Sequence, residues 1–397
     1  EQNWYARTQA SQTLNAAMSL DGSLAYSRGG PAGGDLLSVG RTDYNIERLL
    51  LAQGWDATGA FNWALGDRSG VTFGADWDRT MQNLPTYLQV FPNGATQPDG
   101  PPGGYAQLDN VGAYAQGIYY PMDDLGVTAN LRDDQNSVYG NNLSSRLGLV
   151  YQVNAAITAK ALYGSSFKAP SAPELYGTPL IYGDIVGNPD LKPERANTLE
   201  GLVTFSPSST VDWTSDIYYT HVADKVTFLL QNGNPVAVNL GQLDSAGIES
   251  GVDWRWAFLD GFFNTSLQKT VQTTSDGFAD PNGEIEPYPY WMANAGIGSP
   301  IWHLPLGTFL EARYVGWVPS SQSNFVANGH EAYEIPPAFV VDWTVTSRDL
   351  YWNADKETIV SFKIANLFDA QYTQPGYGGV DYPGLGRTFW LDFSQGF

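Results

Sequence analysis

Carboxylates are the side chains in this sequence that most readily suggest chemistry, because 41 of its 397 residues are Asp or Glu. Their pairs are scattered, however, and no two stand in an arrangement typical of acid–base catalysis. Asp276, Asp280 and Glu284 share one polar segment and could offer oxygen ligands to Ca²⁺, the ligand type that hard cations prefer. Solvated loop carboxylates explain these three residues better, so we expect no metal there.

Signatures of catalysis are missing. The sequence has no G-x-S-x-G, H-E-x-x-H or phosphate-cradling Gly-rich loop with Lys, and the pieces PAGGD and NGNP fit ordinary turns. Cysteine is absent, which excludes disulfides, thiolate metal sites and Cys nucleophiles. The three histidines, His221, His303 and His330, lie far apart and do not form a metal-ligand spacing. We therefore expect neither an enzyme nor a bound cofactor or metal.

The composition instead favours a protein that meets an interface. Aromatic residues make up 14% of the chain and charged residues only 15%, well below the roughly 25% of ordinary soluble domains. No segment approaches the roughly 18 consecutive apolar residues of a transmembrane helix, so a membrane crossing would need strands. The net charge of −21 disfavours nucleic acid and anionic lipid surfaces as partners.

Apolar and polar residues alternate with a period of two, most clearly from residue 245 to residue 258. One face carries Ala246, Ile248, Val252, Trp254, Trp256 and Phe258, and the other carries Gly247, Glu249, Gly251, Asp253 and Arg255. A helix would mix these faces, so the alternation predicts amphipathic β-strands.

Short and long connections alternate between the predicted strands. The short ones are residues 66–70, 121–124, 153–155, 206–209, 259–261 and 303–305; the long ones are roughly 27–46, 79–106, 168–196, 223–244, 275–287, 320–337 and 368–386. Outer-membrane barrels have this layout, with short periplasmic turns, long external loops and strands whose apolar face meets lipid. We expect about sixteen strands, within two either way.

A soluble propeller or sandwich would also give many short strands, with the apolar side in a shared core. Three features favour a barrel. The two kinds of connection stay in phase, aromatic residues such as Tyr151 and Trp302 fall near strand ends as interfacial girdles do, and the chain stops on an amphipathic strand.

Two stretches resemble signatures of TonB-dependent receptors. The first is SSFKAPSAPELYG, residues 165–177, followed by GNPDLKPERANTLEGLV, residues 187–203, and the second is NLFDAQYTQPGYGGVDYPGLGRTFWLDFSQGF, residues 366–397. The residues that carry the resemblance are Phe167, Ala169, Pro170, Asn188, Pro189, Leu191, Pro193, Glu194, Asn366, Leu367, Phe368, Asp369 and Phe397.

Simple structural roles account for most of these motif residues. Pro170 and Pro193 lack a backbone donor and so break strand pairing at the ends of a loop. Glu194 is expected to tie the base of that loop by ion pairing, together with Arg195, rather than to touch a ligand. Asn366 and Asp369 flank a strand end, where a turn role suffices.

The resemblance implies an all-β fold: a transmembrane antiparallel barrel, with residues 1–397 as the C-terminal portion of a 22-stranded wall. Counting back from the last strand, the segment ending at Phe167 becomes strand 13 and the one starting near Thr198 strand 14, which places residues 168–196 outside the cell. The first six or so strands and the N-terminal plug domain are expected to be missing. The start, EQNWYARTQA, has no signal peptide, so either the leader was removed or the chain begins within a longer protein.

The resemblance also implies active uptake of a scarce nutrient through the bacterial outer membrane, with a ferric siderophore as the default cargo. Haem is disfavoured, because haem receptors that resemble this pattern carry a His between the two halves of the first motif, and residues 171–187 contain none. Implied partners are outer-membrane lipid and lipopolysaccharide, the energy-coupling TonB complex through the plug, and the barrel-assembly machinery through Phe397. The alternative is a passive or structural barrel in a larger envelope assembly.

In that setting, cargo would meet aromatic residues of the external loops, which offer rigid stacking surfaces to chelates or macrocycles. The candidates are Tyr176, Tyr182, Tyr288, Tyr290 and Tyr377. For any single one of them, loop packing or a place in the interfacial girdle is the better explanation.

Overall fold

The computed structural model describes residues 2–31, 36–37, 43–84, 86–99, 104–177, 185–231, 234–274, 288–321, 324, 327–329, 331, 333–353, 356–377 and 379–395. The chain divides into two compact units. Unit 1 comprises Glu1–Leu149, Leu162–Asn197 and Val222–Gln242, and unit 2 comprises Val150–Ala161, Thr198–His221 and Leu243–Phe397. No helix in the described part of the chain is long and apolar enough to cross a membrane.

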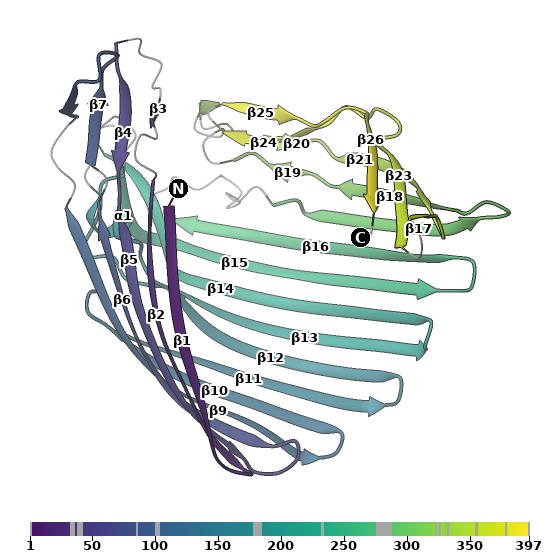
Figure 1. The fold of residues 1–397 in the computed structure, drawn as a ribbon, viewed down its shortest axis with the longest axis horizontal. Coiled ribbons are helices and arrows are strands. Elements are labelled where there is room, and N and C mark those ends of the chain that lie inside the picture. Colours follow the sequence, from purple (N-terminus) through teal and green to yellow (C-terminus); the bar gives the residue numbers. More distant parts are fainter. Residues whose placement is uncertain are drawn as a thin grey trace. The chain divides into compact units, whose positions relative to one another are not determined.

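Unit 1 is built on long antiparallel strands joined mostly by tight turns (Figure 1). They are β1 (Gln2–Asn15), β2 (Met18–Gly30), β5 (Ala52–Ala64), β6 (Gly70–Asn83), β9 (Tyr105–Met122) and β10 (Leu125–Asn136), paired in this order. β11 (Gly140–Asn154) and β12 (Ile157–Lys168) follow. A small separate sheet lies in the two connections that flank β5 and β6: β3 (Leu36–Leu37), β4 (Asn45–Leu49), β7 (Thr86–Val90) and β8 (Thr96–Pro98).

Unit 2 continues the same strand–turn pattern. Its strands are parts of β13 (Glu194–Ser208), β14 (Val211–Gln231) and β15 (Asn234–Arg255), then β16 (Asp260–Thr274), β17 (Trp291–Ile301), β18 (Leu306–Val315), β21 (Ala338–Ser347), β22 (Tyr351–Asn353), β23 (Lys356–Ala365) and β26 (Thr388–Gln395). β16, β17, β18, β21, β23 and β26 are antiparallel neighbours in this order. Short pairs, β19 (Val318–Pro319) with β20 (Glu334–Ile335) and β24 (Thr373–Tyr377) with β25 (Val380–Pro383), lie in the last two long connections.

The strand count agrees with the sequence. The long strands belong to one 18-stranded antiparallel sheet, within the predicted range. β21 and β22 both pair with β23 and act as one interrupted strand. Counting back from β26 on that basis, β13 is ninth and β12 tenth, which are the places predicted for the strands near Thr198 and Phe167.

The prediction of one long loop is wrong. Residues 223–244 were expected to form a long connection, but β14 and β15 have 21 and 22 residues and run through most of it. The Gly, Asn and Asp residues of this segment suggested a loop, yet both strands continue well beyond the ~10 residues that a bilayer requires. A short hairpin between β10 and β11 was also missed; Gly140 has a φ of +75°, which glycine adopts without strain.

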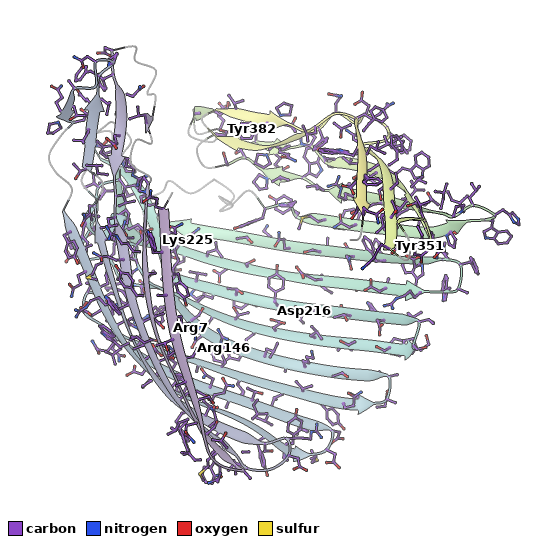
Figure 2. All side chains as sticks on the ribbon, viewed as in Figure 1. Arg7, Arg146, Asp216, Lys225, Tyr351 and Tyr382 are labelled. Atoms are coloured by element: carbon purple, nitrogen blue, oxygen red, sulfur yellow. The ribbon has the colours of Figure 1, made fainter. Side chains whose placement is uncertain are left out.

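The apolar faces of the strands point outward. Ile248, Trp256 and Phe258, from the face predicted to be apolar, are 44%, 52% and 59% exposed. Tyr351, the first residue of β22, is also exposed, and side chains leave both faces of the wall (Figure 2). A soluble sandwich would bury these residues in a shared core, so the arrangement agrees with strands that face lipid.

Candidate functional site

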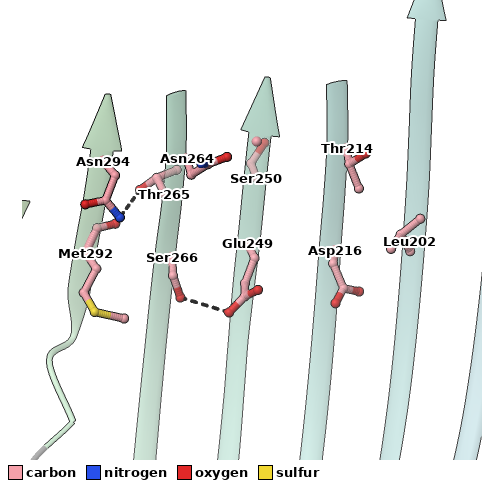
Figure 3. A pocket seen from close by; sticks show the side chains of 11 residues that line it. Leu202, Thr214, Asp216, Glu249, Ser250, Asn264, Thr265, Ser266, Met292 and Asn294 are labelled. Carbon is pink, nitrogen blue, oxygen red and sulfur yellow. Dashed lines mark hydrogen bonds between the residues drawn. The ribbon is translucent and has the colours of Figure 1, made fainter. Parts of the chain in front are cut away.

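The polar face of unit 2 carries a hollow of about 420 Å³. Asp216 of β14, Glu249 of β15 and Ser266 of β16 lie at one level on three neighbouring strands (Figure 3). The Ser266 hydroxyl donates to Glu249 Oε1 at 3.3 Å, whereas Asp216 Oδ1 is buried without a hydrogen-bond partner among the described residues. Thr214, Asn264 and Asn294 complete the polar lining. This arrangement can accept hydrogen bonds and attract positive charge.

A denser polar cluster lies on the corresponding face of unit 1. Arg132 of β10 binds Asp76 of β6 through both terminal nitrogens, at 2.7 and 2.8 Å, and binds Asp134 through Nε and Nη2 at 2.8 and 2.6 Å. Asn110 of β9 donates to Asp134 Oδ1 at 3.0 Å. These contacts tie three strands together on the polar side. Asp78, which pairs with Asn110 in the ladder, has no cationic partner among the described residues.

Carboxylates outnumber cations on both polar faces. In the strands of unit 1 this face carries Asp21, Asp56, Asp76, Asp78, Asp134 and Glu194 against Arg7, Arg132, Arg146 and Lys168. In unit 2 it carries Glu200, Asp212, Asp216, Glu249, Asp253, Asp260, Glu311, Asp342 and Asp392 against Lys160, Arg255, Arg313 and Lys363. Both polar faces are therefore net negative.

The described residues contain no group of three or more His, Cys, Asp or Glu side chains suited to a metal ion. His221 instead contacts Asp244 at 2.9 Å, and Tyr219 donates to the same carboxylate oxygen at 2.6 Å. His303 occupies a turn with a φ of 66°. His330 and the acidic trio Asp276, Asp280 and Glu284 lie outside the described residues.

The first motif begins the long connection after β12. There α1 (Ala172–Tyr176) starts with a capping box, in which Ser171 accepts from the Glu174 amide and Glu174 accepts from the Ser171 amide. Leu175 is fully buried, and Leu191, Val226 and Ala237 complete its apolar cluster. Pro170 is buried as well. The loop therefore folds onto the extended parts of β14 and β15.

The second half of this motif anchors the loop through polar contacts. Asn188 donates to the Ala237 carbonyl at 3.1 Å, and Pro193 is buried while Pro189 is exposed. Glu194 Oε1 accepts from the Val226 amide at 2.9 Å and lies 3.4 Å from Lys168 Nζ. Glu194 thus ties the loop base, as expected.

Other residues of the first motif have simpler surroundings. Arg195 is exposed and makes no ion pair with a described residue, so its expected part in tying the loop base stays a prediction. The ring of Phe167 lies 6.4 Å from that of Tyr139, and Ala169 is half-buried at the start of the loop.

The second motif holds the final long connection. Asn366 has a φ of 53°; its side chain donates to the carbonyls of Ala370 and Leu385 and accepts from the Ala370 amide. Its own amide donates to Asp342 Oδ1 at 2.9 Å. Asp369, also at a φ of 53°, accepts from the Arg387 amide at 2.8 Å. These are turn roles, as predicted for both residues.

The remaining residues of that motif make fewer contacts. Leu367 donates its amide to the Val341 carbonyl and is half-buried, whereas Phe368 is exposed. Phe397 lies outside the described residues.

A polar clasp that the sequence did not suggest joins the last two long connections. Asp381 accepts from Asn324 Nδ2 and the Tyr333 hydroxyl, both at 2.8 Å, and from the Gly376 amide at 3.1 Å. The Asn324 side chain, almost fully buried, also accepts from the Gly379 amide. Burial and the Asp381 carboxylate both raise the pKa of Tyr333. No local pattern marks Asp381, because its side-chain partners lie about fifty residues away.

Three of the five candidate tyrosines have side chains in the described part of the chain, and each has different surroundings. Tyr176 packs against both apolar clusters of the loop after β12, which is a packing role. Tyr288 is 49% exposed, and the backbone of Tyr290 bridges Gln268 and Trp317. Tyr182 and the side chain of Tyr377 lie outside the described residues.

Comparison with known sequences supports the resemblance. Residues 1–367 match the family described as TonB dependent receptor-like, beta-barrel. A vitamin B12 transporter, BtuB, of Vibrio vulnificus is 39% identical over 88 residues, 21% of this chain and 13% of that protein. The BtuB of Vibrio cholerae is 26% identical over 273 residues, 68% of this chain and 39% of that protein. The matched stretches thus span well under half of these relatives.

Solved structures share the fold. The copper transporter OprC superposes with a TM-score of 0.72 at 13% identity, over 98% of this chain and 65% of that one. The FrpB iron transporter of Neisseria meningitidis gives 0.69 at 16% identity, over 98% and 62%. The strand order, the outward apolar faces and the family match lead to one conclusion: this chain belongs to the TonB-dependent receptors, as part of their outer-membrane β-barrel.

Proposed function

We propose that this chain forms the wall and external loops of an active importer, energised through the TonB complex, whose cargo is a large neutral or cationic chelate. A corrinoid of the vitamin B12 type fits this description better than the ferric siderophore expected at first. The observation that carries the proposal is the excess of carboxylates on both polar faces. Such a surface repels the multiply negative charge of a ferric catecholate.

The sequence relatives support this cargo, because those named above are vitamin B12 transporters. The solved neighbours show the fold alone. Of the candidate tyrosines, exposed Tyr288 is the best placed to stack on a macrocycle, and Tyr290 follows two residues later. Tyr182 and Tyr377 stay candidates, whereas the packing of Tyr176 favours a structural part.

Uptake by cells that express the full-length receptor tests the proposal. We expect radiolabelled cobalamin to accumulate, accumulation to stop when an uncoupler collapses the proton gradient, and Tyr288→Ala to weaken binding. ⁵⁵Fe-labelled ferric catecholate should not accumulate. Import of the ferric complex but not of cobalamin would restore the siderophore assignment. Uptake that persists with uncoupler would favour the alternative, a passive barrel.

A further inference from the structure

The outward face of unit 2 contains a second hollow, of about 460 Å³ and almost wholly apolar. It crosses four neighbouring strands, β13 to β16. Its main lining residues are Phe205, Val211, Trp213, Ser250, Val252 and Phe263. Unlike the hollow at Asp216, it opens on the side that faces lipid.

The hollow exists because a small side chain stands among large ones. Ser250 lies between the bulky residues of the adjoining strands and accepts a hydrogen bond from Trp213 Nε1 at 2.8 Å. The ring of Phe205 meets that of Trp213 edge-on at 6.5 Å. The indole is therefore held in place and its only donor is satisfied, so the two rings offer an occupant of this hollow apolar surface.

The depth of the hollow points to one leaflet. Val211 is the first residue of β14, directly after the short turn that ends β13. Trp256 and Phe258, exposed at the short turn after β15, belong to the aromatic girdle at the same end. Because short turns of such barrels are periplasmic, the hollow lies in the periplasmic half of the wall.

We propose that this hollow binds one acyl chain of a phospholipid from the inner leaflet of the outer membrane, and that this lipid is retained instead of exchanging freely. The hollow is continuous with the lipid-facing surface, where acyl chains replace water as the solvent. Neighbouring parts of that surface are filled by exposed aromatic and aliphatic side chains. Here a chain can enter between fixed rings and gain contacts on several sides.

Native mass spectrometry of the full-length protein tests the proposal. Ser250→Phe and Val252→Phe each fill the hollow from β15, and Gly59→Phe adds the same bulk to the outward face of β5, where a Cβ atom would meet nothing within 4 Å. Heat-modifiable migration on gels shows which variants fold. We expect one phospholipid per molecule in the wild type and Gly59→Phe, and at least a tenfold lower lipid-bound fraction in both filled variants. Any of three results would overturn the proposal: equal lipid binding in all folded variants, a detergent molecule in place of the lipid, or the mass of a dimer of the protein.

Fluorescence quenching in vesicles gives an independent test. Phospholipids brominated along the acyl chain should quench part of the tryptophan emission at a low mole fraction, with saturation, and Trp213→Phe should remove that part. Quenching that rises in proportion to the brominated fraction and is unchanged in Trp213→Phe would mean ordinary lipid contact only.

Discussion

Asp342 connects the wall to the final external loop, and replacing it should loosen that loop in a measurable way. Its carboxylate is 4% exposed and accepts from Lys363 at 2.8 Å, from Arg313 at 3.3 Å and from the Asn366 amide at 2.9 Å. Both cations are more than a third exposed, so each ion pair adds at most ~1 kcal/mol. The hydrogen bond from the Asn366 amide to this charged, buried carboxylate contributes about 1.5–3 kcal/mol.

Asp342→Ala removes this acceptor, so the free energy of opening at the Asn366 amide should fall by about 1.5–3 kcal/mol, which is ~10- to 150-fold faster exchange. Asp342→Asn keeps one acceptor oxygen and should give a smaller increase. Hydrogen–deuterium exchange of peptides that cover residues 366–370 measures both. Asp392→Asn, an exposed carboxylate on the same polar face, is the matched control. Unchanged exchange in Asp342→Ala would refute the anchoring argument.

Three further predictions each concern a single side chain. Leu175→Ala, at a side chain 0% exposed, should destabilise the loop after β12 by ~2–5 kcal/mol, seen as faster limited proteolysis there. Burial, with the nearby charges of Asp78 and Asp134, raises the pKa of Tyr139 to about 12, so stability should fall as pH rises from about 10 to about 12; ultraviolet titration against Tyr139→Phe checks this. Tyr333→Phe removes the hydrogen bond to Asp381 and should speed exchange in both of the last two loops by ~10-fold or more, whereas an effect on one loop alone would contradict the clasp.

The sequence predicted the features that depend on local order. Period-two alternation identified the outward face of β15, because each strand residue must point to one side or the other. The tight turn after Tyr151 and the one at His303 were recognised from their turn residues, and strand counting gave the correct number of strands between the loop after Phe167 and the end of the sheet.

Features that depend on partners far along the chain could not be predicted. The continuation of β14 and β15 beyond the bilayer depends on pairing between the two strands and on apolar packing around Val226 and Ala237. The clasp at Asp381 needs Asn324 and Tyr333, which reach it only after the loops fold. Nothing in the surrounding residues distinguishes Asp381 from a solvated loop carboxylate.

The motifs that identify the family do not identify its cargo, for a physical reason. Glu194 holds a loop base and Asn366 holds a turn, and both do so through backbone amides and carbonyls that any chain supplies. Such contacts fix where a loop begins and ends, whatever the loop binds. Discrimination between cargoes must come from side chains outside this frame, such as the carboxylates of the polar faces and the exposed ring of Tyr288. Neutralising Asp216 and Glu249 together should therefore change cargo preference while leaving the loop anchors intact.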